Sequence, residues 1–235
     1  MKWNNCLRTN ELYTSTPVRA FLGQTLRPGG TELTKRLLEL AAVRPGNTVL
    51  DAGCGCGATL ILLEKLGARG IGLDMNAAFL REAPEGRVVR ADVSHLPLSP
   101  ASLDLIICEC AWNLTDKARS MAEFFRVLRP GGLLALSDIF TRGEKNEAWP
   151  VRCCFAQATD LGTVVEHVVE AGFTLDLLED HSPLLARTAA EFVFRHGSLH
   201  GFWQAVTGDA DLAQAACRAA HAARPGLFLL MARRS

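Results

Sequence analysis

The sequence lacks long hydrophobic runs and an excess of charge of either sign. It contains no stretch of 18 consecutive apolar residues, and the opening Met-Lys-Trp-Asn-Asn lacks the apolar core of a signal peptide. The 25 basic and 25 acidic side chains cancel to a formal net charge of zero, whereas nucleic-acid-binding proteins usually carry a basic face. We therefore expect a soluble, cytoplasmic protein that associates with neither membranes nor nucleic acids.

The sequence also lacks paired Cys-x-x-Cys motifs, internal repeats and low-complexity linkers, although it contains eight cysteines. The missing pairs argue against a zinc finger, and thiols in a reducing cytoplasm are not expected to form disulfides. Free cysteine usually behaves as a small buried hydrophobe. The position of each thiol relative to other motifs therefore indicates whether it is a packing residue or a functional one. The eight cysteines are residues 6, 54, 56, 108, 110, 153, 154 and 217.

Hydrophobic periodicity and turn residues predict strands that alternate with helices. The predicted strands are 48–51, 70–74, 88–91, 103–108, 133–137, 173–178 and 227–232. The predicted helices are 31–42, 58–66, 116–128 and 159–171, followed by two or three short helices within 181–224. Residues 1–30 are expected to be irregular because Pro and Gly interrupt them, and Thr31 is expected to cap the first helix. The alternation predicts a doubly wound, Rossmann-like α/β sheet with helices on both faces.

The most informative motif is the segment Asp-Ala-Gly-Cys-Gly-Cys-Gly at residues 51–57, which follows the first predicted strand. Glycines at alternate positions allow the backbone to approach a ligand closely, because they have no Cβ and adopt positive φ easily. Asp51, Asp74 and Asp92 stand at the carboxyl ends of the first three predicted strands. Each aspartate alone could cap a turn, but the three together favour a nucleoside-sized ligand at this edge of the sheet.

These motifs, with Leu-Asp-Leu-Ile-Ile at 103–107 and Val-Leu-Arg-Pro-Gly-Gly at 127–132, resemble the class I S-adenosylmethionine-dependent methyltransferases. The resemblance implies one domain over residues 1–235 whose seven strands have the order 3-2-1-4-5-7-6, with the last strand antiparallel. It also implies a helical insertion at 181–224, and the Gly- and Pro-rich residues 1–30 are expected to form a lid. A nicotinamide dehydrogenase is the competing interpretation of the glycine motif, but the Arg-Pro-Gly-Gly turn and the final strand are not dehydrogenase features.

The resemblance implies S-adenosylmethionine as the cofactor and assigns roles around it. The glycines would face its methionine part, and Asp74 would accept hydrogen bonds from both ribose hydroxyls. Asp92 would accept one from the adenine amino group, while Val93 and Met75 would cover the adenine ring. The predicted cofactor-binding residues are Asp51, Gly53, Gly55, Gly57, Asp74, Met75, Asp92, Val93 and Glu109.

On the acceptor side, the segment Cys-Glu-Cys-Ala-Trp-Asn-Leu-Thr-Asp-Lys at 108–117 resembles the arsenite methyltransferases, whose matching stretch reads Asn-Cys-x-x-Asn-Leu. Cys-Phe-Ala-Gln-Ala at 154–158 is similar to the Cys-x-x-Gly-Ala of that family. The resemblance implies that Cys110 and Cys154 are catalytic residues that hold trivalent arsenic, a soft centre suited to thiolate ligands. The arsenic lone pair would then attack the methyl group without a general base, so positioning would carry most of the catalysis.

The chain departs from this family in three ways. Leu60 stands where the family has an additional cysteine, Gln157 replaces a glycine, and residues 181–235 contain no terminal arsenic-binding domain. A third thiolate would have to come from Cys56, Cys108 or Cys153. Two alternatives therefore stay open: a methyltransferase of an organic small molecule with incidental cysteines, and a non-catalytic protein that binds the cofactor or a soft metal.

A cluster of aromatic residues lies in the predicted helical insertion: Phe192, Phe194, Phe202 and Trp203. Such a cluster indicates either an apolar lid over the acceptor site or the contact face of a homodimer. The sequence does not choose between these two interpretations.

Overall fold

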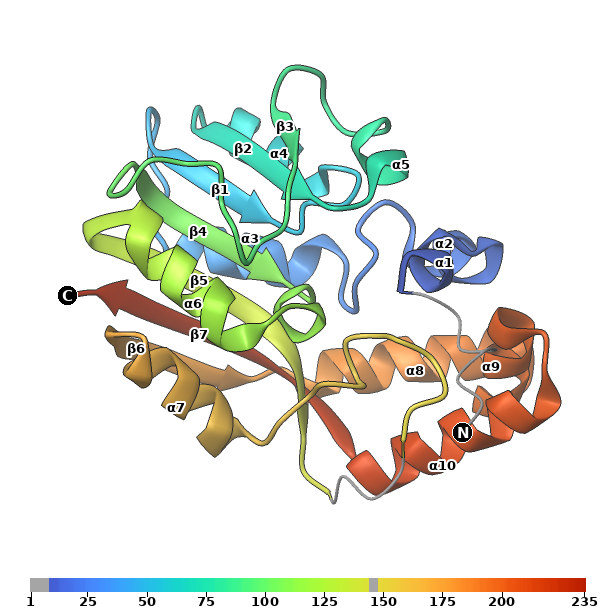
Figure 1. Ribbon diagram of the computed structural model, residues 1–235. Coiled ribbons are helices and arrows are strands. Elements are labelled where there is room, and N and C mark those ends of the chain that lie inside the picture. The colour runs from blue at the N-terminus through green and yellow to red at the C-terminus, as the bar shows by residue number, and fades with distance from the viewer. Residues whose placement is uncertain (1–8, 144–147) are drawn as a thin grey trace.

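The computed structural model describes residues 9–143 and 148–235, so Cys6 lies outside the described part of the chain (Figure 1). Its centre is a seven-stranded sheet with the order β3-β2-β1-β4-β5-β7-β6. The strands are β1 (Thr48–Ala52), β2 (Arg69–Asp74), β3 (Val88–Arg90), β4 (Leu103–Glu109), β5 (Leu128–Thr141), β6 (Phe173–Asp180) and β7 (Pro225–Arg234). All neighbouring strands pair in parallel except β7, which runs antiparallel to both β5 and β6. The predicted fold class and strand order are confirmed.

Helices cover both faces of the sheet, because its strands are apolar on both sides. On one face, Phe124 of α6 (Lys117–Val127) and Val164 of α7 (Leu161–Glu170) pack in a core with Ile106 of β4. On the other face, Leu37 of α3 (Thr31–Leu40) and Leu60 of α4 (Ala58–Lys65) pack with the next residue, Ile107, and its neighbours. Alternate residues of β4 therefore enter opposite cores, as expected for a fully covered strand.

A third core lies beyond the carboxyl ends of the strands. It joins the N-terminal helices α1 (Thr9–Thr14) and α2 (Thr16–Leu22) to α9 (Leu199–Thr207) through Leu12, Val18, Phe202 and Trp203. Helices α8 (Ser182–His196) and α10 (Ala210–Ala223) flank α9 between β6 and β7 (Figure 1). The insertion and the N-terminal segment are thus packed on each other, at the edge of the sheet where ligands of this fold class bind.

The structure corrects several sequence-based expectations. Residues 1–30 are not irregular throughout: α1 and α2 form there, and Pro17 lies in the first turn of α2, where its missing N–H costs no helical hydrogen bond. Gly30, rather than Thr31, occupies the cap position of α3. Strand β5 starts before the Arg-Pro-Gly-Gly turn, because a register irregularity in its pairing with β4 accommodates the extra residues. The four-residue α5 (Ala77–Leu80) was missed.

Among the residues that the structure describes, none of the helices has the length and apolar character needed to span a bilayer.

Candidate active site

A cleft of about 560 Å³ opens at the carboxyl ends of β1, β2 and β4. The strand order reverses between β1 and β4, and such a switch point is where open α/β sheets bind ligands. The predicted cofactor residues that line this cleft are Gly53, Asp74, Met75, Asp92 and Val93. His95, Ala111, Asp116 and Arg119 also line it, and none of these was predicted to do so.

Gly53 sets the floor of the cleft. Its φ is +83°, and a Cβ at this position would lie 2.4 Å from the Cβ of Ala111, which follows β4. The N–H groups of Gly53 and Cys54 both donate to the carbonyl oxygen of Leu73, at 2.7 and 3.0 Å. The turn is hydrogen-bonded to β2 on one side and packed against Ala111 on the other, so only glycine fits at position 53.

Asp74, the last residue of β2, organises the cleft through both carboxylate oxygens. Oδ2 accepts a hydrogen bond from the N–H of Gly55 at 2.9 Å, and Oδ1 accepts one from the N–H of Asn76 at 2.8 Å. Burial raises the pKa of Asp74, and the backbone donors oppose that rise. Each oxygen retains a lone pair, so the ionised carboxylate can also accept two ribose hydroxyls.

Asp92, Val93 and Met75 lie together around the outer part of the cleft. Asp92 Oδ1 accepts a hydrogen bond from the N–H of Ser94 at 2.8 Å, which fixes the carboxylate. Val93 is buried, whereas Met75 is 59% exposed. An apolar wall, an exposed thioether and a carboxylate acceptor suit an adenine ring and its amino group.

Four of the predicted cofactor residues do not line this cleft. Gly55 and Gly57 shape the loop from within: a Cβ at Gly57 would lie 2.6 Å from Cδ of Pro84. Asp51 and Glu109 are buried beside Arg27, which reaches them from the N-terminal segment. Burial raises the pKa of Asp51 to about 7, and the Arg27 guanidinium partly opposes the shift.

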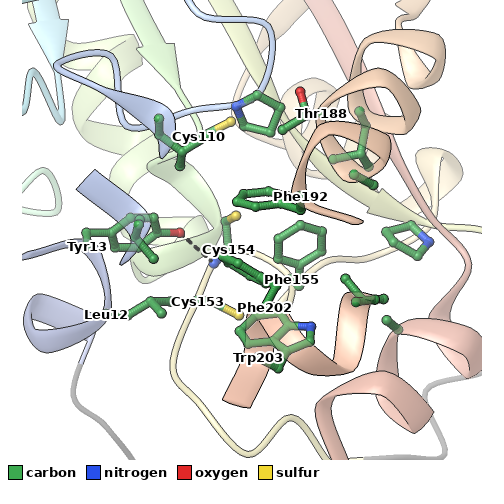
Figure 2. A pocket seen from close by; sticks show the side chains of 18 of the residues that line it. Leu12, Tyr13, Cys110, Cys153, Cys154, Phe155, Thr188, Phe192, Phe202 and Trp203 are labelled. Atoms are coloured by element: carbon green, nitrogen blue, oxygen red, sulfur yellow. Dashed lines mark hydrogen bonds between the residues drawn. The ribbon is translucent and has the colours of Figure 1, made fainter. Parts of the chain in front are cut away.

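A second, smaller pocket of about 150 Å³ lies under the third core (Figure 2). Cys110 enters it from the end of β4, while Cys153 and Cys154 enter from the loop between β5 and α7. The remaining lining is almost entirely apolar and includes Leu12, Leu22, Leu26, Trp149, Phe155, Phe192, Phe202 and Trp203. Cys110 lines this pocket and its neighbour Ala111 lines the cofactor cleft, so the two cavities border the same segment of the chain.

The pocket cysteines are in an apolar environment, and one of them, Cys110, has a strained backbone. Burial raises the pKa of the Cys110 and Cys154 thiols well above the usual range, and the nearby Asp138 raises both further. Cys110 adopts a φ of +53°, rare for a residue with a side chain, while its N–H donates to the carbonyl of Ser137 at 2.8 Å. Backbone strain of this kind concentrates at functional sites.

Asp138 holds the turn that follows Cys110. Its carboxylate accepts the backbone N–H of Asn113 at 2.8 Å and the Asn113 side-chain amide at 3.0 Å. The same amide donates to the carbonyl of Ile139 at 2.7 Å. Burial raises the pKa of Asp138 to about 7, against these donors. The Asn-Leu and Ser-Asp-Ile motifs are thereby one unit that links the Cys110 turn to β5.

Cys108 and Cys56 are not placed to join Cys110 and Cys154. Cys108 is fully buried in a core of the sheet, and Cys56 contacts Arg19 and Glu82 near the glycine loop. Of the three predicted sources of a third thiolate, Cys153 alone lines the pocket. Within residues 9–143 and 148–235, no three His, Cys, Asp or Glu side chains are grouped so as to hold a metal ion.

The four aromatic residues of the insertion do not all lie in the same environment. Phe192, Phe202 and Trp203 line the pocket, whereas Phe194 is 91% exposed. The first three fit the interpretation as an apolar cover, and a homodimer contact through Phe194 stays a prediction.

Comparison with known proteins agrees with this geometry. A family model described as a methyltransferase domain matches residues 50–136. The uncharacterized methyltransferase sll0829 of Synechocystis is 32% identical over 170 residues, which are 64% of this chain and 78% of that protein. An arsenite methyltransferase of Halobacterium salinarum is 33% identical over 57% of this chain, and a malonyl-[acyl-carrier protein] O-methyltransferase of Yersinia pestis is 35% identical over 50%. The matches cover only 39% and 47% of those two relatives.

Solved structures show the same fold. Phosphoethanolamine N-methyltransferase 2 of Haemonchus contortus, in complex with S-adenosyl-L-methionine, has a TM-score of 0.73 at 17% identity and covers 93% of this chain and 56% of its own. The [4+2]-cyclase SpnF has a TM-score of 0.72 at 20% identity and covers 97% of both chains. A cyclase on this fold illustrates that the architecture alone does not define the reaction.

The chain belongs to the class I S-adenosylmethionine-dependent methyltransferases. S-adenosylmethionine is its cofactor, and the residues present fit that molecule: Gly53 provides backbone without a side chain, and Asp74 provides free carboxylate lone pairs. Sequence reasoning found the glycine loop and the strand-end aspartates, and it missed Arg27 and Tyr13. Neither of these two residues belongs to a local motif that could have marked it.

Proposed function

We propose that this protein transfers a methyl group to a trivalent arsenic centre that Cys110 and Cys154 hold. One observation carries the proposal: two thiols from distant segments point into a single pocket (Figure 2), and the residue after Cys110 lines the cofactor cleft. The similarity to an arsenite methyltransferase over 57% of the chain supports the same acceptor. Soft thiol ligands are the protein groups that As(III) prefers.

The raised thiol pKa values are compatible with this chemistry. Arsenous acid condenses with two neutral thiols: two As–S bonds form, two As–O bonds break, and the thiol protons leave in two water molecules. The arsenic stays trivalent and neutral, so its dithiolate fits an apolar pocket that disfavours ionised sulfur. Its lone pair is not used in the bonds to sulfur and remains available as a nucleophile.

When bound, S-adenosylmethionine supplies an electrophilic methyl group on a sulfonium. The chain places the acceptor: Cys110 follows β4 and directly precedes Ala111 of the cofactor cleft, and Asp138 fixes the turn after it. The apolar lining excludes water from the acceptor, which limits competing hydrolysis. Cys153, beside Cys154 in the pocket, is the nearest source of a third sulfur.

We also propose that residues 9–30 form a lid over the acceptor pocket and that the insertion completes the same domain. The segment contributes Tyr13 and Leu26 to the acceptor pocket, and Leu26 lies against the glycine loop, where a Cβ at Gly55 would be 3.3 Å from it. We therefore expect this segment to move when an acceptor enters the pocket. Slower trypsin cleavage within residues 9–30 after addition of S-adenosylhomocysteine would support the lid, and unchanged cleavage would count against it.

An apolar organic acceptor is the second candidate. Aromatic side chains dominate the pocket, and hydrophobic lining with few polar groups is typical of sites for organic molecules. The thiols would then be small residues that shape the cavity, and the similarity to a malonyl-[acyl-carrier protein] O-methyltransferase suits this reading.

Direct arsenic binding distinguishes the two candidates. Trp149 and Trp203 line the pocket, so their fluorescence reports its occupation by As(III). We expect Cys110→Ser and Cys154→Ser each to weaken binding at least roughly tenfold, which corresponds to about 1.4 kcal/mol. Cys217→Ser, outside the pocket on α10, is the matched control and should bind like the parent protein. Equal binding by all four proteins, or none, would reject the arsenic proposal and favour an organic acceptor.

A further inference from the structure

Tyr13 is brought to the thiols of the acceptor pocket by a contact between distant parts of the chain. It lies on α1, whereas Cys154 lies in the loop between β5 and α7, and both residues line the pocket. The backbone N–H of Cys154 donates to the Tyr13 hydroxyl at 3.3 Å, and Figure 2 shows that the hydroxyl points at the Cys154 segment. The polar end of the phenol is therefore held at Cys154.

The Tyr13 hydroxyl keeps its own hydrogen for a further interaction. A phenolic hydroxyl both donates and accepts, and the Cys154 N–H uses only its accepting side. Among the described residues that line the pocket, Thr188 carries the other hydroxyl, and it donates its hydrogen to the carbonyl of Leu184 at 3.0 Å. Within this described lining, Tyr13 is thus the hydroxyl whose hydrogen is not donated to the backbone.

The Cys154 thiol is the neighbour that can use this hydrogen. Burial and the nearby Asp138 raise the pKa of the Cys154 thiol well above its usual range, and a hydrogen bond with the Tyr13 side chain lowers it. Burial also raises the pKa of Tyr13, so a free phenolate is disfavoured in the pocket. Any proton that passes through Tyr13 must therefore be exchanged for another in the same step.

We propose that Tyr13 is a catalytic residue that relays the Cys154 proton to the group that this thiol displaces, an inference that rests on the proposed As(III) chemistry. The S–H bond and one As–O bond break while the S–As bond forms. Tyr13 gives its own proton to the departing hydroxide, and the thiol proton replaces it on the phenol oxygen. Water leaves, the arsenic stays trivalent, and Tyr13 ends the step protonated. Release of the acceptor reverses these transfers.

A proton relay has a kinetic signature that a loosened lid does not share. It speeds loading and release equally, so its loss slows both and leaves the equilibrium affinity little changed. We expect Tyr13→Phe, which keeps the ring on the third core, to slow association and dissociation of As(III) roughly 100-fold each. Stopped-flow fluorescence of Trp149 and Trp203 measures both rates. A segment that only opens more often would instead admit As(III) faster.

Ser15→Ala is the matched control. The Ser15 hydroxyl donates to the carbonyl of Leu12 at 2.6 Å, so this variant also loses a hydrogen bond of the N-terminal segment, but Ser15 does not line the pocket. Its As(III) association should not be slowed. Unchanged or faster association in Tyr13→Phe, slower association without slower dissociation, or equal slowing in Ser15→Ala would each overturn the relay.

Alkylation by iodoacetamide separates failure of the relay from failure of the proposed function. The thiolate is the nucleophile, so loss of the Tyr13 hydrogen bond should slow alkylation of Cys154 and leave that of Cys217 on α10 unchanged, as mass spectrometry of the two peptides measures. A parent protein that does not bind As(III) would reject the proposed function. In that case slower alkylation of Cys154 in Tyr13→Phe would support the relay, and unchanged or faster alkylation would overturn it.

Discussion

The backbone N–H of Cys154 donates a hydrogen bond to the hydroxyl of Tyr13 at 3.3 Å. Tyr13 is the one tyrosine of the chain and lies on α1, so the contact fastens the N-terminal segment to the cysteine loop of the acceptor pocket. Burial raises the pKa of Tyr13 well above its usual range, and the hydroxyl therefore stays protonated near the Cys154 sulfur. Through this hydrogen bond, closure of the proposed lid is coupled to the position of the Cys154 loop, which holds the proposed acceptor.

Replacement of Tyr13 by phenylalanine removes the hydroxyl and keeps the ring. A neutral hydrogen bond contributes about 0.5–1.5 kcal/mol, so we expect the N-terminal segment to open roughly 2- to 10-fold more often. Limited trypsin digestion measures this at Arg19, which lies in the segment, whereas the Arg27-Pro28 bond resists trypsin. Cleavage elsewhere in the chain is the internal control, and an unchanged ratio of the two rates would show that the contact does not hold the segment.

Gly53→Ala is expected to damage the cofactor cleft. The new methyl group would lie 2.4 Å from the Cβ of Ala111, and the φ of +83° adds strain. Gly46→Ala is the matched control, since Gly46 has a φ of +86° with no atom within 4 Å of the added Cβ. Both variants should lose about 1–2 kcal/mol of unfolding free energy from the backbone.

The two glycine variants should differ in binding. We expect Gly53→Ala to weaken binding of S-adenosylhomocysteine at least roughly 100-fold, about 2.7 kcal/mol, and Gly46→Ala to leave it unchanged. Calorimetry and thermal unfolding separate the effects. Similar affinities in both variants would mean that the Gly53 backbone is not in contact with the cofactor.

Affinity for S-adenosylhomocysteine should depend on pH through Asp51. Burial raises the pKa of this carboxyl to about 7, while Arg27 lowers it and Glu109 and Asp74 raise it. Asp51 is predicted to bind the cofactor, and we expect its ionised carboxylate to pair with the α-ammonium of the ligand, so protonation of Asp51 below about pH 7 competes with binding. We expect the affinity to be constant above about pH 8 and to fall toward tenfold per pH unit below pH 6.

Titrations between pH 5.5 and 8.5 measure this dependence. Asp51→Asn should bind more weakly at high pH and show a flatter profile, because its side chain does not titrate. A parent protein with constant affinity across the range would show that Asp51 does not face the ammonium.

The parts that sequence reasoning found are those that local patterns define. The strand order follows from the alternation of strands and helices together with the family motifs, and Gly53 and Asp74 stand inside one short signature. The sequence could not place Arg27 or Tyr13. These residues reach the site only because α1, α2 and the insertion pack into a third core, a tertiary event without a periodic signal. For the same reason the sequence could not predict that Arg27 lies beside Asp51 and Glu109, although these two acids were predicted to bind the cofactor.

The division among the cysteines also required the structure. Cys108 and Cys110 are two positions apart, yet strand alternation sends the first into the sheet core and the backbone turn sends the second into the pocket. Cys153 and Cys154 both line the pocket because their loop passes beneath α9. Spacing alone does not separate an incidental thiol from a ligand.

Arsenic speciation tests the central claim most directly. The parent protein would be incubated with As(III), S-adenosylmethionine and a thiol reductant, beside Cys110→Ser, Cys154→Ser and Cys217→Ser. Our account predicts methylated arsenic from the parent protein and from Cys217→Ser, with at least roughly 100-fold less from the two pocket variants. No methylated arsenic from a parent sample that binds S-adenosylmethionine, or equal product from all four proteins, would contradict it.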